Sequence, residues 1–193
     1  MSLGLLLAAC GGDRDSPAQA ITDFSGDPEA VDDSFAAIHD HLRERPDELR
    51  AAALEHLGEE DPNVHYAAMY ALSLTAEPGE SADGLRRYLG SDDLNERFLA
   101  AGSLLARGEK EAIPVLIDLL DSEDPVAYRD PPRMAWQVAR SALLTFVEQD
   151  HGLVDAEGFE DVSATKPAWE RWWDEAGDAV QWIEEGTYYR SGP

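Results

Sequence analysis

Apolar residues recur along this chain at helical spacing, in short stretches separated by turns. In the first stretch Phe35, Ile38 and Leu42 fall on one face of a helix, which Pro46 limits. Six further stretches follow, at about residues 49–57, 64–72, 85–89, 94–105, 113–120 and 138–146. No run alternates with the period of two that a half-buried strand shows. The pattern therefore predicts an all-α domain.

The turns between these stretches repeat one phrase three times. In residues 57–62, 89–94 and 120–125, a leucine precedes an acidic or small turn and then an aspartate that opens the next helix. The leucines lie 32 and then 31 residues apart, and the aspartates keep the same intervals. A period of this length, built from two helices, is typical of a solenoid whose units bury their apolar faces against one another.

Residues 33–151 resemble HEAT repeats, in particular the short bacterial kind first associated with phycobilisome lyases. Residues 61–64 (Asp-Pro-Asn-Val) match the turn that starts the outer helix of such a repeat, and residues 112–120 match its inner helix. His65 replaces the arginine that usually follows the turn, and the fourth unit carries an insertion at about 128–133. The resemblance implies a right-handed α-solenoid of antiparallel helix pairs, whose second helices line a concave binding face.

The repeat register is lost in residues 152–193. An acidic connector there is followed by an expected helix over 166–176 that carries Trp169, Trp172 and Trp173. The last unit of a solenoid must have its apolar face covered, so these side chains predict an aromatic C-terminal cap. An aromatic ligand-binding box is the alternative interpretation.

Cys10 is the only cysteine, so no intrachain disulfide can form. Residues 7–11 (Leu-Ala-Ala-Cys-Gly) resemble a lipobox, which implies that residues 1–10 are a residual signal segment and that Cys10 is lipidated. A charged start is missing and the apolar run is short, so an apolar tail with an incidental cysteine is the alternative. Residues 11–32 are expected to be a flexible acidic tether. An extracytoplasmic, lipid-anchored protein follows, or a cytoplasmic one if the segment is no signal.

The chain is strongly acidic, with 40 Asp and Glu residues against 15 Lys and Arg residues and a formal net charge of −25. Such a charge argues against nucleic acid or an anionic lipid surface as a partner. It fits an origin in high salt, where ions screen the repulsion between carboxylates. An acidic face that attracts a basic partner or cations is the other interpretation.

The sequence offers no pattern typical of catalysis. His39 and His41 have a spacing that places their rings on different faces of a helix, so we expect no metal site. Neither a Gly-x-Ser-x-Gly elbow nor a glycine-rich phosphate loop is present. We therefore expect a protein that is no enzyme and has no cofactor. A bilin-binding or lyase-related role is the alternative that the resemblance suggests, and a salt-adapted structural domain without a ligand is another.

The function that these observations favour is protein binding or scaffolding through the second helices of the repeats. Arginine and aromatic residues are the usual anchors of protein interfaces, and arginines are scarce in this chain. The sequence identifies neither the partner nor the oligomeric state. The candidate partner-binding residues are Arg86, Arg87, Tyr88, Tyr128, Arg129 and Arg133.

Overall fold

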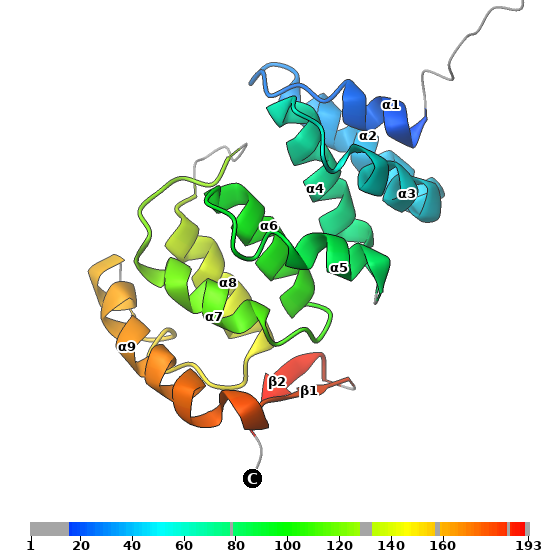
Figure 1. Ribbon diagram of the computed structural model, residues 1–193. Helices are drawn as coiled ribbons and strands as arrows, with labels where there is room; N and C mark the ends of the chain where they lie inside the picture. Colours follow the sequence, from blue (N-terminus) through cyan, green and yellow to red (C-terminus); the bar gives the residue numbers. More distant parts are fainter. Residues whose placement is uncertain (1–15, 78, 128–132, 157–158, 185, 192–193) are drawn as a thin grey trace, which may run out of the picture.

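The computed structural model describes residues 16–77, 79–127, 133–156, 159–184 and 186–191 (Figure 1). Helices make up most of this part of the chain, and a short hairpin follows them. The elements are α1 (Pro17–Thr22), α2 (Val31–Glu44), α3 (Pro46–His56), α4 (Pro62–Thr75), α5 (Glu80–Arg86), α6 (Leu94–Leu105), α7 (Ala112–Asp118), η1 (Leu119–Asp121), α8 (Ala135–Phe146), α9 (Phe159–Ala176), η2 (Gly177–Ala179), β1 (Gln181–Ile183) and β2 (Tyr188–Arg190).

Two of the three repeated aspartates begin helices as the sequence predicts. The carboxylate of Asp61 accepts hydrogen bonds from the backbone N–H groups of Asn63 (2.9 Å) and Val64 (3.4 Å) at the start of α4. Asp93 does the same for the first turn of α6, from Asn95 at 2.7 Å and Glu96 at 3.1 Å. These N-caps satisfy N–H groups that no helical carbonyl can reach.

The third aspartate does not open a helix, and this prediction is wrong. After Asp124 the chain leaves the repeat, and α8 begins only at Ala135. Backbone hydrogen bonds close the base of this insertion: Ala135 donates to Asp124 at 2.9 Å, and Val126 donates to Arg133 at 2.8 Å. The chain therefore returns to the point where it left, and α8 starts next to Asp124 in space.

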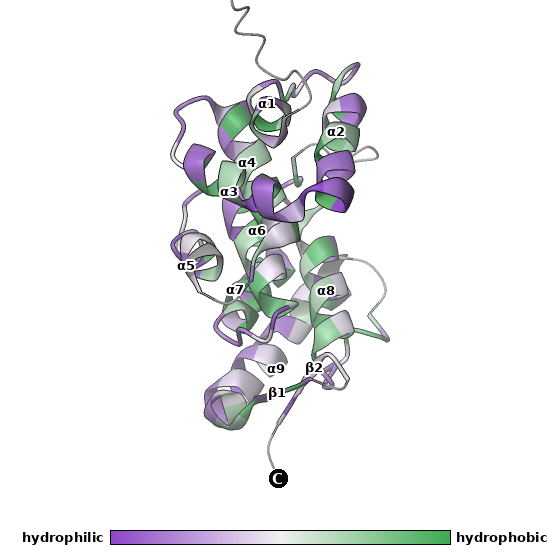
Figure 2. Ribbon diagram, turned by 90° about the vertical axis from the view of Figure 1, so that its right-hand side faces the viewer, coloured by the Kyte–Doolittle hydropathy of each residue, from purple (hydrophilic) through white to green (hydrophobic). Residues whose placement is uncertain are grey.

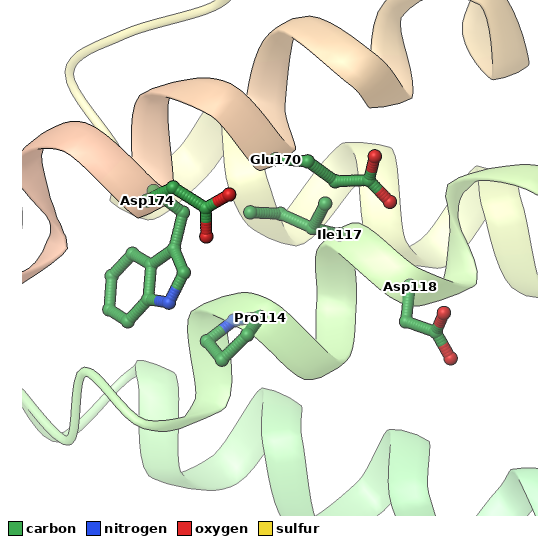
Figure 3. Close-up of a pocket in the computed structure, with 6 residues that line it drawn as sticks. Pro114, Ile117, Asp118, Glu170 and Asp174 are labelled. Carbon is green, nitrogen blue, oxygen red and sulfur yellow. The ribbon is translucent and has the colours of Figure 1, made fainter.

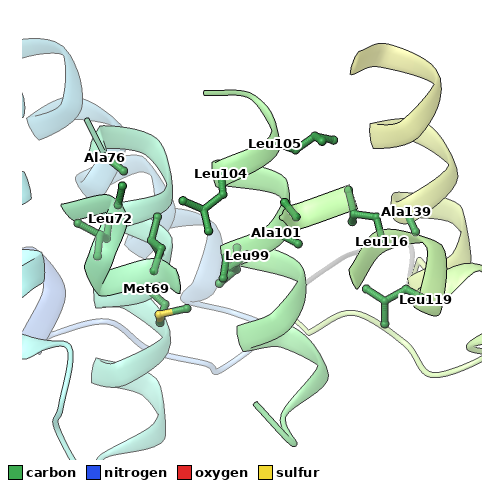
Figure 4. Close-up of a cluster of buried hydrophobic side chains, with 14 of the residues drawn as sticks. Met69, Leu72, Ala76, Leu99, Ala101, Leu104, Leu105, Leu116, Leu119 and Ala139 are labelled. Atoms are coloured by element: carbon green, nitrogen blue, oxygen red, sulfur yellow. The ribbon is translucent and has the colours of Figure 1, made fainter. Parts of the chain in front are cut away.

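The helices form two layers. The first-helix layer contains α4, α6 and α8, and the second-helix layer contains α3, α5 and α7, with α3 packed on α4 and α7 on α6. Helix α6 is central: it packs against α4 on one side and against α7 and α8 on the other, as Figure 4 shows for their buried side chains. Leucines and alanines dominate this core, including Leu72, Ala101, Leu104 and Leu116, all 0 % exposed.

Hydrogen bonds join successive units, and the bonded residues lie about one repeat apart in the chain. The ring of His65 lies between two of them: its Nδ1 donates to the carbonyl oxygen of Leu57 (2.8 Å), and its Nε2 lies 2.7 Å from Oε1 of Glu96, 31 residues further on. Among the described residues, five other hydrogen bonds also join positions 30 to 32 apart. They join His39 to Tyr70, Tyr88 to Leu57, Ser103 to Ser73, Arg107 to Ala76 and Ala127 to Asn95.

The tether predicted over residues 11–32 is wrong for its described part. Ser16 caps α1, and Ile21 (0 % exposed) and Phe24 (4 % exposed) belong to the hydrophobic core. The ring of Phe24 packs edge-on against Phe35 of α2, with centroids 5.2 Å apart. Helix α1 packs against α3 and α4, so the burial of these two apolar side chains attaches the segment to the first repeat.

The C-terminal part packs against the last repeat. Helix α9 begins at Phe159, earlier than the predicted 166, and lies against α7, η1 and α8. Strands β1 and β2 form an antiparallel hairpin that the sequence does not predict, because three-residue strands are too short to show alternation. Tyr189 of this hairpin is buried, and its hydroxyl donates to the carbonyl oxygen of Leu105 at 3.1 Å. The hairpin therefore covers the end of α6.

Candidate binding surface

Arg86 lies at the surface but is paired with carboxylates of its own chain rather than free for a partner. Its guanidinium bonds to Glu109 (2.5 Å), to Glu111 (2.8 Å) and to Asp83. The hydrogen bonds with Glu109 and Glu111 raise the pKa of Arg86 well above its ordinary value. Because these two glutamates precede α7, Arg86 joins α5 to the next unit.

The side chain of Tyr88 also bonds within the molecule, whereas, among the described residues, that of Arg87 does not. The hydroxyl of Tyr88 donates to the carbonyl oxygen of Leu57 at 3.0 Å, and its ring lies 5.5 Å from that of His65. Burial raises the pKa of Tyr88 above 10.0. The side chain of Arg87 is exposed and has no hydrogen bond or ion pair within the described ranges.

Of the remaining candidates the structure describes only Arg133, and it does not lie beside these residues. Tyr128 and Arg129 lie outside the described residues. Arg133 precedes α8 in the first-helix layer, and within the described part of the chain no contact joins α8 to α5. The four candidates that the structure describes therefore do not form one binding surface around Arg86.

Most of the Lys and Arg side chains that the structure describes connect elements to one another. Arg107 is an example: its Nε donates to the carbonyl oxygen of Ala76, and burial lowers its pKa. Lys110 donates to the carbonyl oxygens of Gly177 (2.9 Å) and Asp178 (3.0 Å). These cations therefore mostly bind other parts of their own chain.

A groove of about 300 Å³ runs between α6 and α8, and the described residues that form its walls include no carboxylate. Phe98 and Phe146 form apolar walls, and Arg133 is the only charged residue among these lining residues. Arg133 is exposed and has no ion pair with any residue that the structure describes. The other lining residues are Gly102, Val138, Ser141, Ala142 and Thr145.

The absence of acid extends beyond the groove to the whole of α8. None of its 12 residues is Asp or Glu, although the chain has 40 of them among 193. Figure 2 shows hydrophobic colour on α4, α6, α7 and α8, in contrast to the more hydrophilic colour of α3 and α9. The sequence contains this signal at residues 135–146, and α4, which also has no Asp or Glu, shares it.

Two further hollows are acidic. One of about 370 Å³ lies between α7 and α9, where Glu170 and Asp174 extend beside Ile117 and Asp118 (Figure 3). The other, of about 170 Å³, lies between α4 and α6 and contains His65 and Glu96, which bond to each other. Their carboxylates are typical of a solvated surface, so neither hollow stands out from the rest of the molecule.

The histidines are engaged in separate contacts. His39 bonds to Tyr70 (2.9 Å), and His41 is buried beside Arg45 (3.1 Å). Within the described ranges, no three His, Cys, Asp or Glu side chains are placed to hold a metal ion. In the same ranges no helix combines the length and the apolar character needed to cross a bilayer.

His151 gives the protein a pH-dependent contribution to stability. It packs edge-on against Trp169, with ring centroids 4.9 Å apart, and burial lowers its pKa below 6.5. The fold therefore favours the neutral ring: the contribution is complete above pH 6.5 and is lost as the pH falls from there through the lower folded-state pKa. We expect His151→Phe to remove this pH dependence, measured by urea unfolding between pH 5 and 8 as a difference from wild type. A difference that stays constant over that range contradicts this.

The comparisons with known proteins bear on the central repeats. Residues 50–130, which run from α3 across α4 to α7 and into the insertion, match the family model described as HEAT repeats. No curated protein and no solved structure matches the chain. The paired helices and the period of 31 residues agree with that family model, and this part of the chain is therefore similar to HEAT repeats.

Proposed function

We propose that this chain is a non-catalytic protein-binding scaffold, and that a partner docks in the groove between α6 and α8. The observation that carries the proposal is the absence of carboxylates from the described walls of this apolar groove, in a chain of net charge −25. The centres of protein interfaces are depleted of charged residues and enriched in aromatic residues and arginine. The groove fits this composition, because Phe98 and Phe146 are aromatic and Arg133 is an arginine.

The bonds between successive repeats support the same function. His65 of α4 bonds to Glu96 of α6, and Arg86 of α5 pairs with Glu111 at the start of α7. A preformed surface loses little conformational entropy when a partner binds, which is why stacked helical repeats serve as binding scaffolds. The binding site proposed here lies on the first helices of the repeats, not on the second helices that the family resemblance implies.

The experiment compares three versions of the full-length protein in affinity capture from the native cells, with mild crosslinking and mass spectrometry. Ser141→Glu places a carboxylate in the groove, whereas Val154→Glu adds the same charge at a side chain that is 60 % exposed and lies outside it. We expect a stoichiometric partner with wild type and Val154→Glu, and its loss with Ser141→Glu. Equal capture by all three contradicts the proposal.

We further propose, from the lipobox resemblance, that a lipid on Cys10 anchors the scaffold at the outer face of a membrane. Changing Cys10→Ser in the full-length chain should then move the protein from the membrane fraction to the soluble fraction of its own host. Fractionation followed by immunoblotting measures this. A wild-type protein that is already soluble in its host contradicts the anchor, and it leaves the proposed binding groove untouched.

A further inference from the structure

We propose that the occupant of the α6–α8 groove is a basic amphipathic α-helix of the partner protein. This inference rests on the proposed function and adds the chemistry of the partner. It stands on two observations: the apolar surface between two neighbouring helices, and the net negative charge of the chain.

The walls of the groove suit the apolar face of a helix. Helices α6 and α8 pack side by side, and the surface between them presents Phe98 and Phe146 with the small residues Gly102 and Ala142. Gly102 is open to the groove, because a Cβ atom built there meets only Phe98, at 4.0 Å. Side chains of a third helix can enter such a space, as ridges enter grooves wherever helices pack, and they present apolar anchors at i, i+3, i+4 and i+7.

The net negative charge of the chain favours a partner helix with basic flanks. Asp124 lies at the start of α8, and Glu148, which pairs with Arg190, follows its end; the side chains of both acids are exposed. The net charge of −25 repels an acidic helix, whereas Lys and Arg on the solvent side of a docked helix would be attracted. An apolar centre and a charged rim are the usual anatomy of an interface.

Arg133 sets the direction of the docked helix. Among the described residues it is the only charged one that lines the groove, and it lies at the end where α8 begins. A cation is favourable beside the carbonyl groups at a helix C-terminus and unfavourable beside the N–H groups at its N-terminus. The C-terminal end of the partner helix therefore lies towards Arg133.

The test uses two synthetic peptides of Leu and Lys, each about 18 residues or roughly five helical turns long. Both have the same composition and charge, but only one places its leucines on a single face of the helix. Fluorescence anisotropy with the full-length protein at physiological salt gives the two affinities. We expect the amphipathic peptide to bind at least about tenfold more tightly than its isomer, a difference of about 1.4 kcal/mol.

Variants of the groove separate docking from simple electrostatic attraction, because the two predict opposite changes in the affinity for the peptide. An added carboxylate attracts a basic peptide, so simple attraction predicts equal or tighter binding for both Ser141→Glu and Val154→Glu. Docking predicts about tenfold weaker binding for Ser141→Glu and no loss for Val154→Glu. Thr145→Glu, at a second exposed position of the groove, is expected to repeat the loss if Ser141→Glu reduces helicity.

Equal binding of the two peptides, or tighter binding by both groove variants, overturns the inference. If the peptides give such a result but Ser141→Glu still abolishes capture of the native partner, the proposed function stands, because the groove then binds a different kind of segment. If capture is unaffected by Ser141→Glu, the proposed function itself is wrong.

Discussion

Trp169→Ala is expected to lower the free energy of unfolding by about 3–5 kcal/mol, the usual cost of deleting a buried tryptophan side chain. Trp169 is 0 % exposed and belongs to the core that joins α9 to the repeats. Its ring packs edge-on against Trp172, with centroids 5.5 Å apart, and against His151. At about 2–4 °C for each kcal/mol in a chain of this size, the melting temperature should fall by roughly 10 °C.

Two variants on the same helix control for this effect. Arg171→Ala changes an exposed side chain two residues away and should alter stability by less than about 0.5 kcal/mol. Trp169→Phe keeps an aromatic ring and removes an indole N–H that has no hydrogen-bond partner in the described structure, so its loss should be smaller than that of alanine. Equal melting of Trp169→Ala and Arg171→Ala would show that α9 does not stabilise the repeats.

Arg86→Glu should destabilise the protein by about 2 kcal/mol, while Arg87→Glu should leave its stability unchanged within about 0.5 kcal/mol. The first change removes the ion pairs with Asp83, Glu109 and Glu111 and places a fourth carboxylate among them. The second changes an exposed side chain that has no hydrogen bond or ion pair among the described residues. Thermal unfolding followed by circular dichroism measures both.

The difference in stability between Arg86→Glu and Arg87→Glu is also expected to depend on salt. Molar salt screens the repulsion that a glutamate at position 86 would feel from the three acidic side chains around it, so the difference between the two variants should become smaller there. Identical melting of both variants in dilute buffer would contradict the structural role of Arg86. A loss of partner binding by Arg86→Glu is therefore no test of an interface, because the fold changes with it.

Much of the fold could be predicted from local sequence. The positions of Asp61 and Asp93 follow from the chemistry of an N-cap, which needs only the next three residues of the chain. The period of 31 residues predicts stacked units, and the bond between His65 and Glu96 occurs at that interval. The sequence shows that His65 departs from the repeat pattern, but it does not show that Glu96 is the partner of this side chain.

The remainder depends on contacts between distant residues. The bonds that close the insertion join Asp124 to Ala135, so the sequence alone suggests a helix start at the aspartate. Arg86 was identified as a candidate for binding because it is a rare cation, yet Glu109 and Glu111, which hold it, lie 23 and 25 residues away in the chain. Scarcity of positive charge makes each arginine valuable for internal pairing, which local patterns do not reveal.

The candidate site was predicted only in part. Arg133 is one of the partner-binding candidates that the sequence suggests, and it lines the α6–α8 groove. Phe98 and Phe146 belong to the apolar stretches predicted at about 94–105 and 138–146, and a groove between their partly exposed rings forms only where α6 and α8 lie side by side. The absence of acid from α8 was the available sequence signal for this surface.

The most direct test of the binding groove is photocrosslinking from position 141 in living cells. A photoreactive amino acid replaces Ser141 in the full-length protein, and a second version carries it at the exposed Val154 as a control. The proposed function predicts one predominant protein adduct from position 141 and none of that adduct from position 154. The same adducts from both positions, or none from position 141, would contradict it.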